Sequence, residues 1–303
     1  MKKIVSCLLV AMLALPRFAQ EAAVAEKSDY LPQAGDFAIG FNLNPFATFA
    51  GNLSNGTTGN AIDNARIGGN ALLSNMTMPN AYPLVSLQGK YMFTDNLGLR
   101  ANIGLMLTRE NNREYVLDDA ALAADPLSRQ KVVDAEHIAS NGGSLAVGVE
   151  YRIGKRRVQG VFSGSALYAF SVAHTTYEFG NAITEVNQRP TSGSFVTYTA
   201  ISSTMPNARL LKNYTSDGIH TIGLVGSVGV EGFVAPKISI GAEVNLALLY
   251  TWTPQQYGEF EGFNTLTKKV EGFTELVAPK SSRFVFGTQN IGANLFMNFY
   301  FNR

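Results

Sequence analysis

Hydrophobic and polar residues alternate along residues 84–107, on both sides of a short polar segment at 94–97. Successive side chains of a β-strand point to opposite faces, so each arm of this segment is predicted to be a strand with one apolar and one polar face. Strands of about ten residues with this pattern are typical of transmembrane β-barrels, in which lipid lies outside and a polar lumen lies inside. The apolar positions are Val85, Leu87, Tyr91 and Phe93 in the first arm and Leu97, Leu99, Ala101, Ile103, Leu105 and Leu107 in the second.

The same alternation predicts six further strands, and short turns near residues 95, 155 and 236 alternate with four long connections. An even number of strands, with short turns on one side and long loops on the other, is the layout of bacterial outer-membrane barrels. The expected fold class is therefore all-β, an eight-stranded antiparallel transmembrane β-barrel with four long extracellular loops. The further strands are expected at 36–46, 144–153, 158–177, 219–234, 238–252 and 283–301, and the loops at 47–83, 109–142, 178–218 and 253–282.

Three segments depart from a simple alternation of strand and loop. Phe284 and Phe286 fall on the polar face of the last strand, which favours a bulge near 287–290 or an extension above the bilayer. Residues 194–202 allow an additional strand, but no neighbour can be assigned to it, so a loop hairpin above the membrane is expected. The loop at 109–142 holds much of the charge of the chain and a possible short helix near 118–124.

The N-terminus has the order of a secretory signal, with two lysines, an apolar run at 4–15 and small residues after it. We expect a signal peptide at 1–25, cleaved between 19 and 25, and an outer-membrane barrel at 26–303. The single cysteine, Cys7, lies in the part removed, so neither disulfide nor thiol chemistry is expected in the mature chain. No later stretch approaches the ~18 consecutive apolar residues that a membrane helix requires.

Charged residues make up 16% of the 303 residues. An average soluble domain has roughly a quarter, so the low charge agrees with a membrane location. The chain has 29 Gly, 19 Phe and 12 Tyr, residues that suit tight turns, strands and interfacial aromatic belts. The formal net charge of +1, from 24 Lys+Arg and 23 Asp+Glu, gives no electrostatic case for a nucleic-acid partner.

The chain resembles the small outer-membrane β-barrels of the outer membrane protein A and X type over its whole mature length. The resemblance rests on the turn at 91–100, YMFTDNLGLR, which is similar to the periplasmic turns of that family, and on the aromatic C-terminal strand. The family usually ends on an aromatic residue, whereas here Asn302 and Arg303 follow Phe301. The resemblance implies a bacterial outer-membrane location, extracellular loops and periplasmic termini. It also implies two partners, outer membrane lipids and the barrel-assembly machinery, which reads the C-terminal strand.

Six charged residues fall on the polar parity, close to the short-turn end of the strands. Three positive and three negative side chains at similar depth can pair, and each would be costly if it were unpaired in a narrow lumen of low dielectric constant. We therefore expect a structural network that closes the lumen, since the interior of an eight-stranded barrel is just wide enough for side chains to fill. The six residues are Lys90, Arg100, Glu150, Arg152, Glu231 and Glu243.

Aromatic residues gather near both ends of the strands on the apolar parity. We expect them to form two interfacial girdles, and the alternative is a stacking platform for a ligand. The turn-side girdle consists of Tyr91, Phe93 and Tyr151, and the loop-side girdle consists of Phe170, Tyr250 and Trp252.

The three histidines, His137, His174 and His220, are candidate bases for ester hydrolysis, because some eight-stranded barrels modify lipid A. Two of them lie on the lipid-facing parity and one in a loop, which favours interfacial residues beside the aromatic belt. Their spacing is not that of metal ligands. We expect no enzyme, no catalytic residue, no cofactor and no metal site.

Two classes of function agree with this pattern. The first is a non-catalytic surface protein whose long loops serve envelope integrity, adhesion or association with other outer-membrane components. The second is a small-solute or lipid transporter, or a lipid A-modifying enzyme, of the same architecture. The sequence does not identify the partner of the loops.

Overall fold

A computed structural model describes residues 30–43 and 85–302. The predicted signal peptide with its cleavage site, and the predicted loop at 47–83, lie outside the described residues. Within them the chain is nearly all β-structure, with twelve strands and the short helix α3 (Asp119–Ala124). No helix in the described part of the chain is long and apolar enough to cross a membrane. The expected all-β antiparallel architecture is confirmed.

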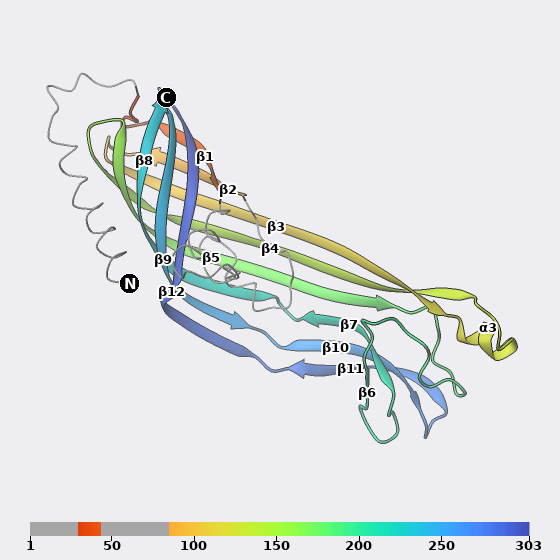
Figure 1. Cartoon of the computed structure of the whole chain (residues 1–303). Helices are drawn as coiled ribbons and strands as arrows, with labels where there is room; N and C mark the ends of the chain where they lie inside the picture. Colours follow the sequence, from red (N-terminus) through yellow and green to blue (C-terminus); the bar gives the residue numbers. More distant parts are fainter. Residues whose placement is uncertain (1–29, 44–84, 303) are drawn as a thin grey trace, which may run out of the picture.

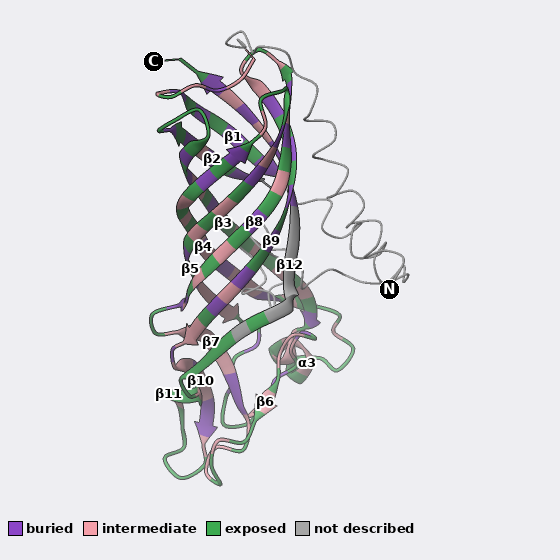
Figure 2. Ribbon diagram, turned by 90° about the vertical axis from the view of Figure 1, so that its left-hand side faces the viewer, coloured by how far each residue is buried: buried purple, intermediate pink, exposed green. Residues whose placement is uncertain are grey.

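Each of the eight predicted strands corresponds to a strand of the structure. Each pairs antiparallel with the next of the eight, β5 with β8 and β9 with β12 included. The pairing of β12 with β1 brings the series back to its start. Figure 2 shows these strands side by side and inclined to the long axis of the molecule. The strand ring, as we call this set, consists of β1 (Phe37–Leu43), β2 (Val85–Met92), β3 (Leu97–Leu117), β4 (Lys131–Ile153), β5 (Val158–Glu178), β8 (Ile219–Ala235), β9 (Ile238–Thr253) and β12 (Ser281–Phe301).

Buried and exposed residues alternate along the strand ring (Figure 2). The large exposed residues are apolar and many of the buried ones are polar. On β9, Ser239, Glu243 and Asn245 are buried, whereas Ile240 and Val244 between them are exposed. Soluble proteins bury the opposite kind of residue. The strands therefore present to their surroundings the surface that a hydrocarbon solvent requires.

The bulge expected in the last strand is confirmed. The register between β12 and β9 shifts between Phe286 and Ile291, after Phe284 has paired with Tyr250 and Phe286 with Leu248. Residues 287–290 of β12 lie opposite the single residue Ala247 of β9, and this excess of three residues, an odd number, changes the parity. Phe284 and Phe286 consequently lie with the exposed apolar residues, each 62% accessible.

The prediction of an irregular loop at 109–142 is wrong. β3 continues to Leu117 and β4 begins at Lys131, and the two strands pair over this whole length. Charged residues are compatible with strands here because both faces of a sheet can meet water once it has left an apolar environment. The short helix expected near 118–124 is confirmed as α3, and the Asp118 carboxylate caps its N-terminus by accepting from the Ala120 and Ala121 N–H groups.

The connections at 178–218 and 253–282 also contain strands that the sequence pattern did not predict. β10 pairs on one side with β11 and on the other with β7, and β7 pairs with the end of β5, so the sheet continues beyond the strand ring. Within 194–202 only β6 forms, and it pairs with β7. Figure 1 shows these strands gathered with α3 at the end of the molecule opposite the C-terminus. They are β6 (Tyr198–Thr199), β7 (Ala208–Thr215), β10 (Gln256–Asn264) and β11 (Lys269–Ala278).

The connection between β5 and β7 is held against β3 and β4 by carboxylates. The fully buried Asp134 accepts from the Gly180 N–H at 2.8 Å and the Gly193 N–H at 2.9 Å. Hydrogen bonds from the Ser194 hydroxyl and N–H hold the pKa of the Glu114 carboxyl below its usual value. Partial burial tends to raise the pKa of the Asp119 carboxyl. Hydrogen bonds from the Thr191 N–H and the Asn187 side-chain amide outweigh this effect, so the pKa lies below its usual value.

We predict that Asp134→Ala loosens this connection without unfolding the strand ring. Two buried N–H groups lose their acceptor, and an unsatisfied buried polar group costs about 1–3 kcal/mol. Limited digestion with a glutamate-specific protease should then be faster at the exposed Glu185 in this connection, while heat-modifiable migration on a gel stays unchanged. Asp125→Ala, at the exposed end of α3, is the matched control. An unchanged cleavage rate at Glu185 would show that Asp134 does not anchor the segment.

Candidate functional site

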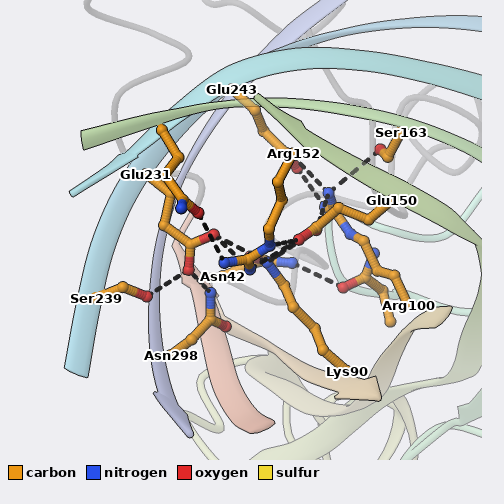
Figure 3. A network of polar contacts seen from close by, with 12 residues as sticks. Asn42, Lys90, Arg100, Glu150, Arg152, Ser163, Glu231, Ser239, Glu243 and Asn298 are labelled. Carbon is orange, nitrogen blue, oxygen red and sulfur yellow. Dashed lines mark hydrogen bonds and ion pairs between the residues drawn. The ribbon is translucent and has the colours of Figure 1, made fainter. Parts of the chain in front are cut away.

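The six predicted charged residues lie together inside the strand ring (Figure 3). They come from five strands, and none is more than 5% exposed. Their side chains form one continuous group in which every cation contacts at least one carboxylate. The residues are Lys90 on β2, Arg100 on β3, Glu150 and Arg152 on β4, Glu231 on β8 and Glu243 on β9. We call this group the charge network.

Glu231 is the most heavily bonded carboxylate of the charge network. Arg152 Nη2 donates to it at 2.7 Å and Lys90 Nζ lies 3.4 Å away. Three neutral groups complete its surroundings: the Ser239 hydroxyl, Asn298 Nδ2 at 3.0 Å and the Tyr300 hydroxyl at 2.9 Å. Both oxygens of this fully buried carboxylate therefore have charged or polar donors, which is the condition for keeping an ionised group away from water.

Of the other two carboxylates, Glu150 shares Lys90 and Arg152 with Glu231, and Glu243 binds Arg100. Glu150 lies 2.8 Å from Lys90 Nζ and 2.8 Å from Arg152 Nη2. Glu243 accepts two hydrogen bonds from Arg100, one of them from Nη1 at 2.7 Å. Arg100 Nη1 also lies 3.8 Å from Glu150, so this pair is joined to the rest of the charge network. A two-pronged contact between guanidinium and carboxylate is the strongest and most directional of the common ion pairs.

Glycines stand across the strands from three of these charged residues. Arg100 pairs in register with Gly148, Glu231 with Gly241 and Glu243 with Gly229. A Cβ atom on Gly148 would lie 2.0 Å from the Gly164 carbonyl oxygen, and one on Gly241 would lie 2.2 Å from the Phe296 ring. A side chain does not fit at these positions. A glycine therefore stands opposite each of the three charged residues.

Aromatic rings bound the charge network toward the turn end. Lys90 Nζ lies 5.0 Å from the centroid of the Phe296 ring, and the Arg152 guanidinium lies 5.1 Å from that of Tyr300 and 5.9 Å from that of Phe233. These distances allow cation–π attraction. Sequence reasoning missed Tyr300 and Asn298 as members of the site, although both share the inward parity that selected the six charged residues.

A polar cavity lies on the loop side of the charge network. Arg100 and Glu243 form part of its lining, and Asn42 Nδ2 donates to Asn102 Oδ1 at 3.0 Å beside them. Uncharged side chains supply most of the remaining surface, which suits water or a small neutral solute better than an ion. The other lining residues include Ser86, Ser144, Ser165, Ser227, Asn245 and Asn294.

The predicted girdle residues lie on the outer face of the strand ring. Tyr91 and Phe93 pack edge to face at 5.5 Å on the turn side, where Tyr151 is also exposed. On the loop side, Phe170 and Tyr250 are exposed, and Trp252 is half-buried. The ring centroids of Tyr250 and Trp252 lie 6.1 Å apart, and the exposed rings of both groups stand on the outside of the strands.

The three histidines have different neighbours, and His137 Nε2 lies 3.7 Å from the Glu178 carboxylate. The ring nitrogens of His220 contact the Tyr168 hydroxyl at 3.0 Å and the Asp217 carbonyl oxygen at 3.2 Å. His137 contacts the Asn111 side chain at 2.6 Å, and the pairing of β4 with β5 places His174 two strand positions away. The described part of the chain contains no cluster of three or more histidine, cysteine, aspartate or glutamate side chains that could hold a metal ion.

We predict that Glu243→Ala and Glu150→Ala each lower the unfolding midpoint in detergent. Removing one partner of a buried ion pair leaves the other charge uncompensated, which costs about 3–5 kcal/mol. Glu243→Asp should cost less because it keeps the charge, and Glu243→Lys should cost more than alanine because it adds a fourth cation. Midpoints that do not follow this order would mean that the charge network does not stabilise the fold.

No known protein-family model and no curated protein sequence matches this chain. Among solved structures it is similar to the outer membrane protein AlkL in lipid bilayers, with 10% identity, a TM-score of 0.32, and 94% of this chain and 97% of that chain covered. It is similar to the attachment invasion locus protein Ail of Yersinia pestis, with 11% identity, a TM-score of 0.29, and coverage of 88% and 99%. It is also similar to the outer membrane protein OprG from Pseudomonas aeruginosa, with 14% identity, a TM-score of 0.29, and coverage of 90% and 99%.

Proposed function

We propose that this chain is a bacterial outer-membrane protein whose strand ring is an eight-stranded transmembrane β-barrel. The supporting observation is the inversion of the strands, which expose apolar side chains outward and bury charged and amide side chains inward. A closed series of pairings also meets the requirement that every backbone N–H and C=O in lipid be satisfied within the protein. The short turns then face the periplasm together with the termini, and the long connections are extracellular.

The barrel acts as a closed, non-catalytic support for its extracellular part. The charge network fills the lumen with side chains that bond to one another, so no continuous aqueous path remains at that level. Beyond the band of exposed apolar residues, β3, β4, β5, β7, β10 and β11 continue as a sheet. This sheet presents the connections at which envelope components or other cells are contacted, so the function is envelope integrity, adhesion or association with other outer-membrane components.

Two partners follow from this assignment. Outer membrane lipids surround the exposed apolar face, and the barrel-assembly machinery engages the C-terminal strand. β12 pairs with β1 along 295–301, and the Phe301 ring stacks on that of Phe37 at 5.1 Å. The last strand therefore completes the ring, and its end carries an outward aromatic pair that the assembly machinery could bind.

Transport of a small solute is the second candidate function. The polar cavity beside Arg100 and Glu243 is the observation that favours it, because an Asn- and Ser-lined space inside a barrel is suited to uncharged polar molecules. In that case the charge network would have to rearrange to let a solute pass.

We predict that trypsin added to whole cells cleaves the chain at Arg129, which is exposed in the connection between β3 and β4 on the loop side. Lys155, in the turn between β4 and β5, should be cut only after the outer membrane is permeabilised. Mass spectrometry of the fragments identifies the sites. Cleavage of intact cells confined to Lys155 or Lys237 would reverse the topology.

We predict no stable conductance for the purified protein in planar bilayers, because buried side chains block the lumen. We also expect lipid A from a deletion strain to have the mass spectrum of lipid A from its parent. A steady single-channel conductance would select the transporter, and an altered lipid A would select the enzyme. Heat-modifiable migration of the same preparation is the control that the protein is folded.

A further inference from the structure

The first described residues run across the turn end of the strand ring before β1 begins. We call residues 30–36 the closing strap. In Figure 1 this part of the chain lies at the same end of the molecule as the C-terminus. The closing strap has no regular secondary structure, yet Pro32 and Asp36 are buried, so it is packed against the ring and does not extend into solvent.

The closing strap contacts all three short turns. At the turn between β2 and β3, the Ala34 N–H donates to the Asp95 carboxylate at 2.9 Å. At the turn between β4 and β5, the Arg157 guanidinium lies 3.7 Å from the centroid of the Tyr30 ring. At the turn between β8 and β9, Lys237 Nζ donates to the Leu31 carbonyl oxygen at 3.0 Å. These three contacts fix the closing strap against the turn end of the strand ring.

Lys237 adopts a backbone conformation that favours glycine. Its φ of 61° lies in the left-handed region, which a residue with a side chain enters only at some cost. The same residue forms an ion pair with Asp36 and accepts from the Tyr300 N–H through its carbonyl oxygen at 2.8 Å. The lysine side chain thus gives this turn a contact to the closing strap that glycine would not supply, which accounts for a strained residue there.

The closing strap lies over an apolar layer that separates it from the charge network. Tyr30 and Leu31 pack against a buried cluster that includes Met92, Phe233 and Tyr300. Phe233 and Tyr300 are the rings beneath the Arg152 guanidinium. From the lumen toward the turn end, the order is therefore charged side chains, apolar side chains and then the backbone of the closing strap.

We propose that the closing strap is a periplasmic closure of the barrel, a second barrier in series with the charge network. It ties the three turns to one another and covers the mouth that they surround. This inference rests on the proposed function for its orientation and for the barrier inside the lumen. Opening either barrier alone leaves the other in place, so a path through the barrel requires both to be released.

The test uses four forms of the full-length mature protein in planar bilayers with potassium chloride. The first form is the wild type, and the second is the network variant Lys90→Ala/Glu150→Ala, which removes one charge of each sign and keeps the remainder balanced. The third is the strap variant Tyr30→Ala/Asp95→Ala/Lys237→Gly, which removes one contact at each turn and places glycine where φ is positive. The fourth form combines the two variants.

We expect the combined form to conduct at least about tenfold more than either variant alone, because two barriers in series give a strongly non-additive response. A second measurement is the labelling rate of Leu31→Cys by a membrane-impermeant maleimide from the turn side, which should rise in the strap variant. Cys7 does not interfere, since it lies in the predicted signal peptide. Heat-modifiable migration checks that each form is folded.

Three results would overturn the inference. Full conductance of the network variant alone would show that the closing strap is no barrier, while leaving the proposed block by the charge network intact. A combined form that stays closed although labelling has risen would show that releasing the closing strap and the charge network together does not open the lumen. Labelling that does not rise would mean that these contacts do not hold the strap. Full conductance of the strap variant alone would instead refute the proposed block by the charge network.

Discussion

Charge compensation inside the strand ring is the constraint on which the rest of the structure depends. A strand that exposes apolar residues outward must send its polar residues inward, where water is scarce and an unpaired charge is costly. Glu231 illustrates the solution, because its carboxylate is surrounded by Arg152, Lys90 and three neutral donors. Three cations balance three carboxylates, so the charge network is neutral as a whole. Removing one member leaves an opposite charge without compensation.

That compensation also dictates backbone features that look unrelated to charge. Gly148, Gly229 and Gly241 stand opposite charged residues in register, and a Cβ atom at any of them would collide with the backbone of a neighbouring strand or with the Phe296 ring. A bulge in β12 then restores the outward position of Phe284 and Phe286 after the register has shifted. The pairing, the glycines and the bulge are thus consequences of one requirement, apolar side chains outside and paired charges inside.

The fold of the ring could be predicted from sequence because a period of two assigns each residue to one face. The same parity placed the six charged residues together and located the bulge. It did not identify Tyr300 as a partner of Glu231 and Arg152, because parity gives the face of a residue but not its height along the axis relative to other strands. It also missed β7, β10 and β11, whose two faces are both partly exposed and so carry little alternation.

The two ends of the strand ring differ in how strongly their contacts depend on one another. Toward the turns, charged groups, the aromatic rings of Phe233 and Tyr300 and the closing strap lie in successive layers, each in contact with the next. Toward the loops, the lumen is lined mainly by serine and asparagine, and the sheet that continues outward is held by local contacts such as those of Asp134. Contacts of the second kind can change one at a time, because none of them compensates a buried charge of the network. The loop end is therefore where contacts can change without disturbing the charge network.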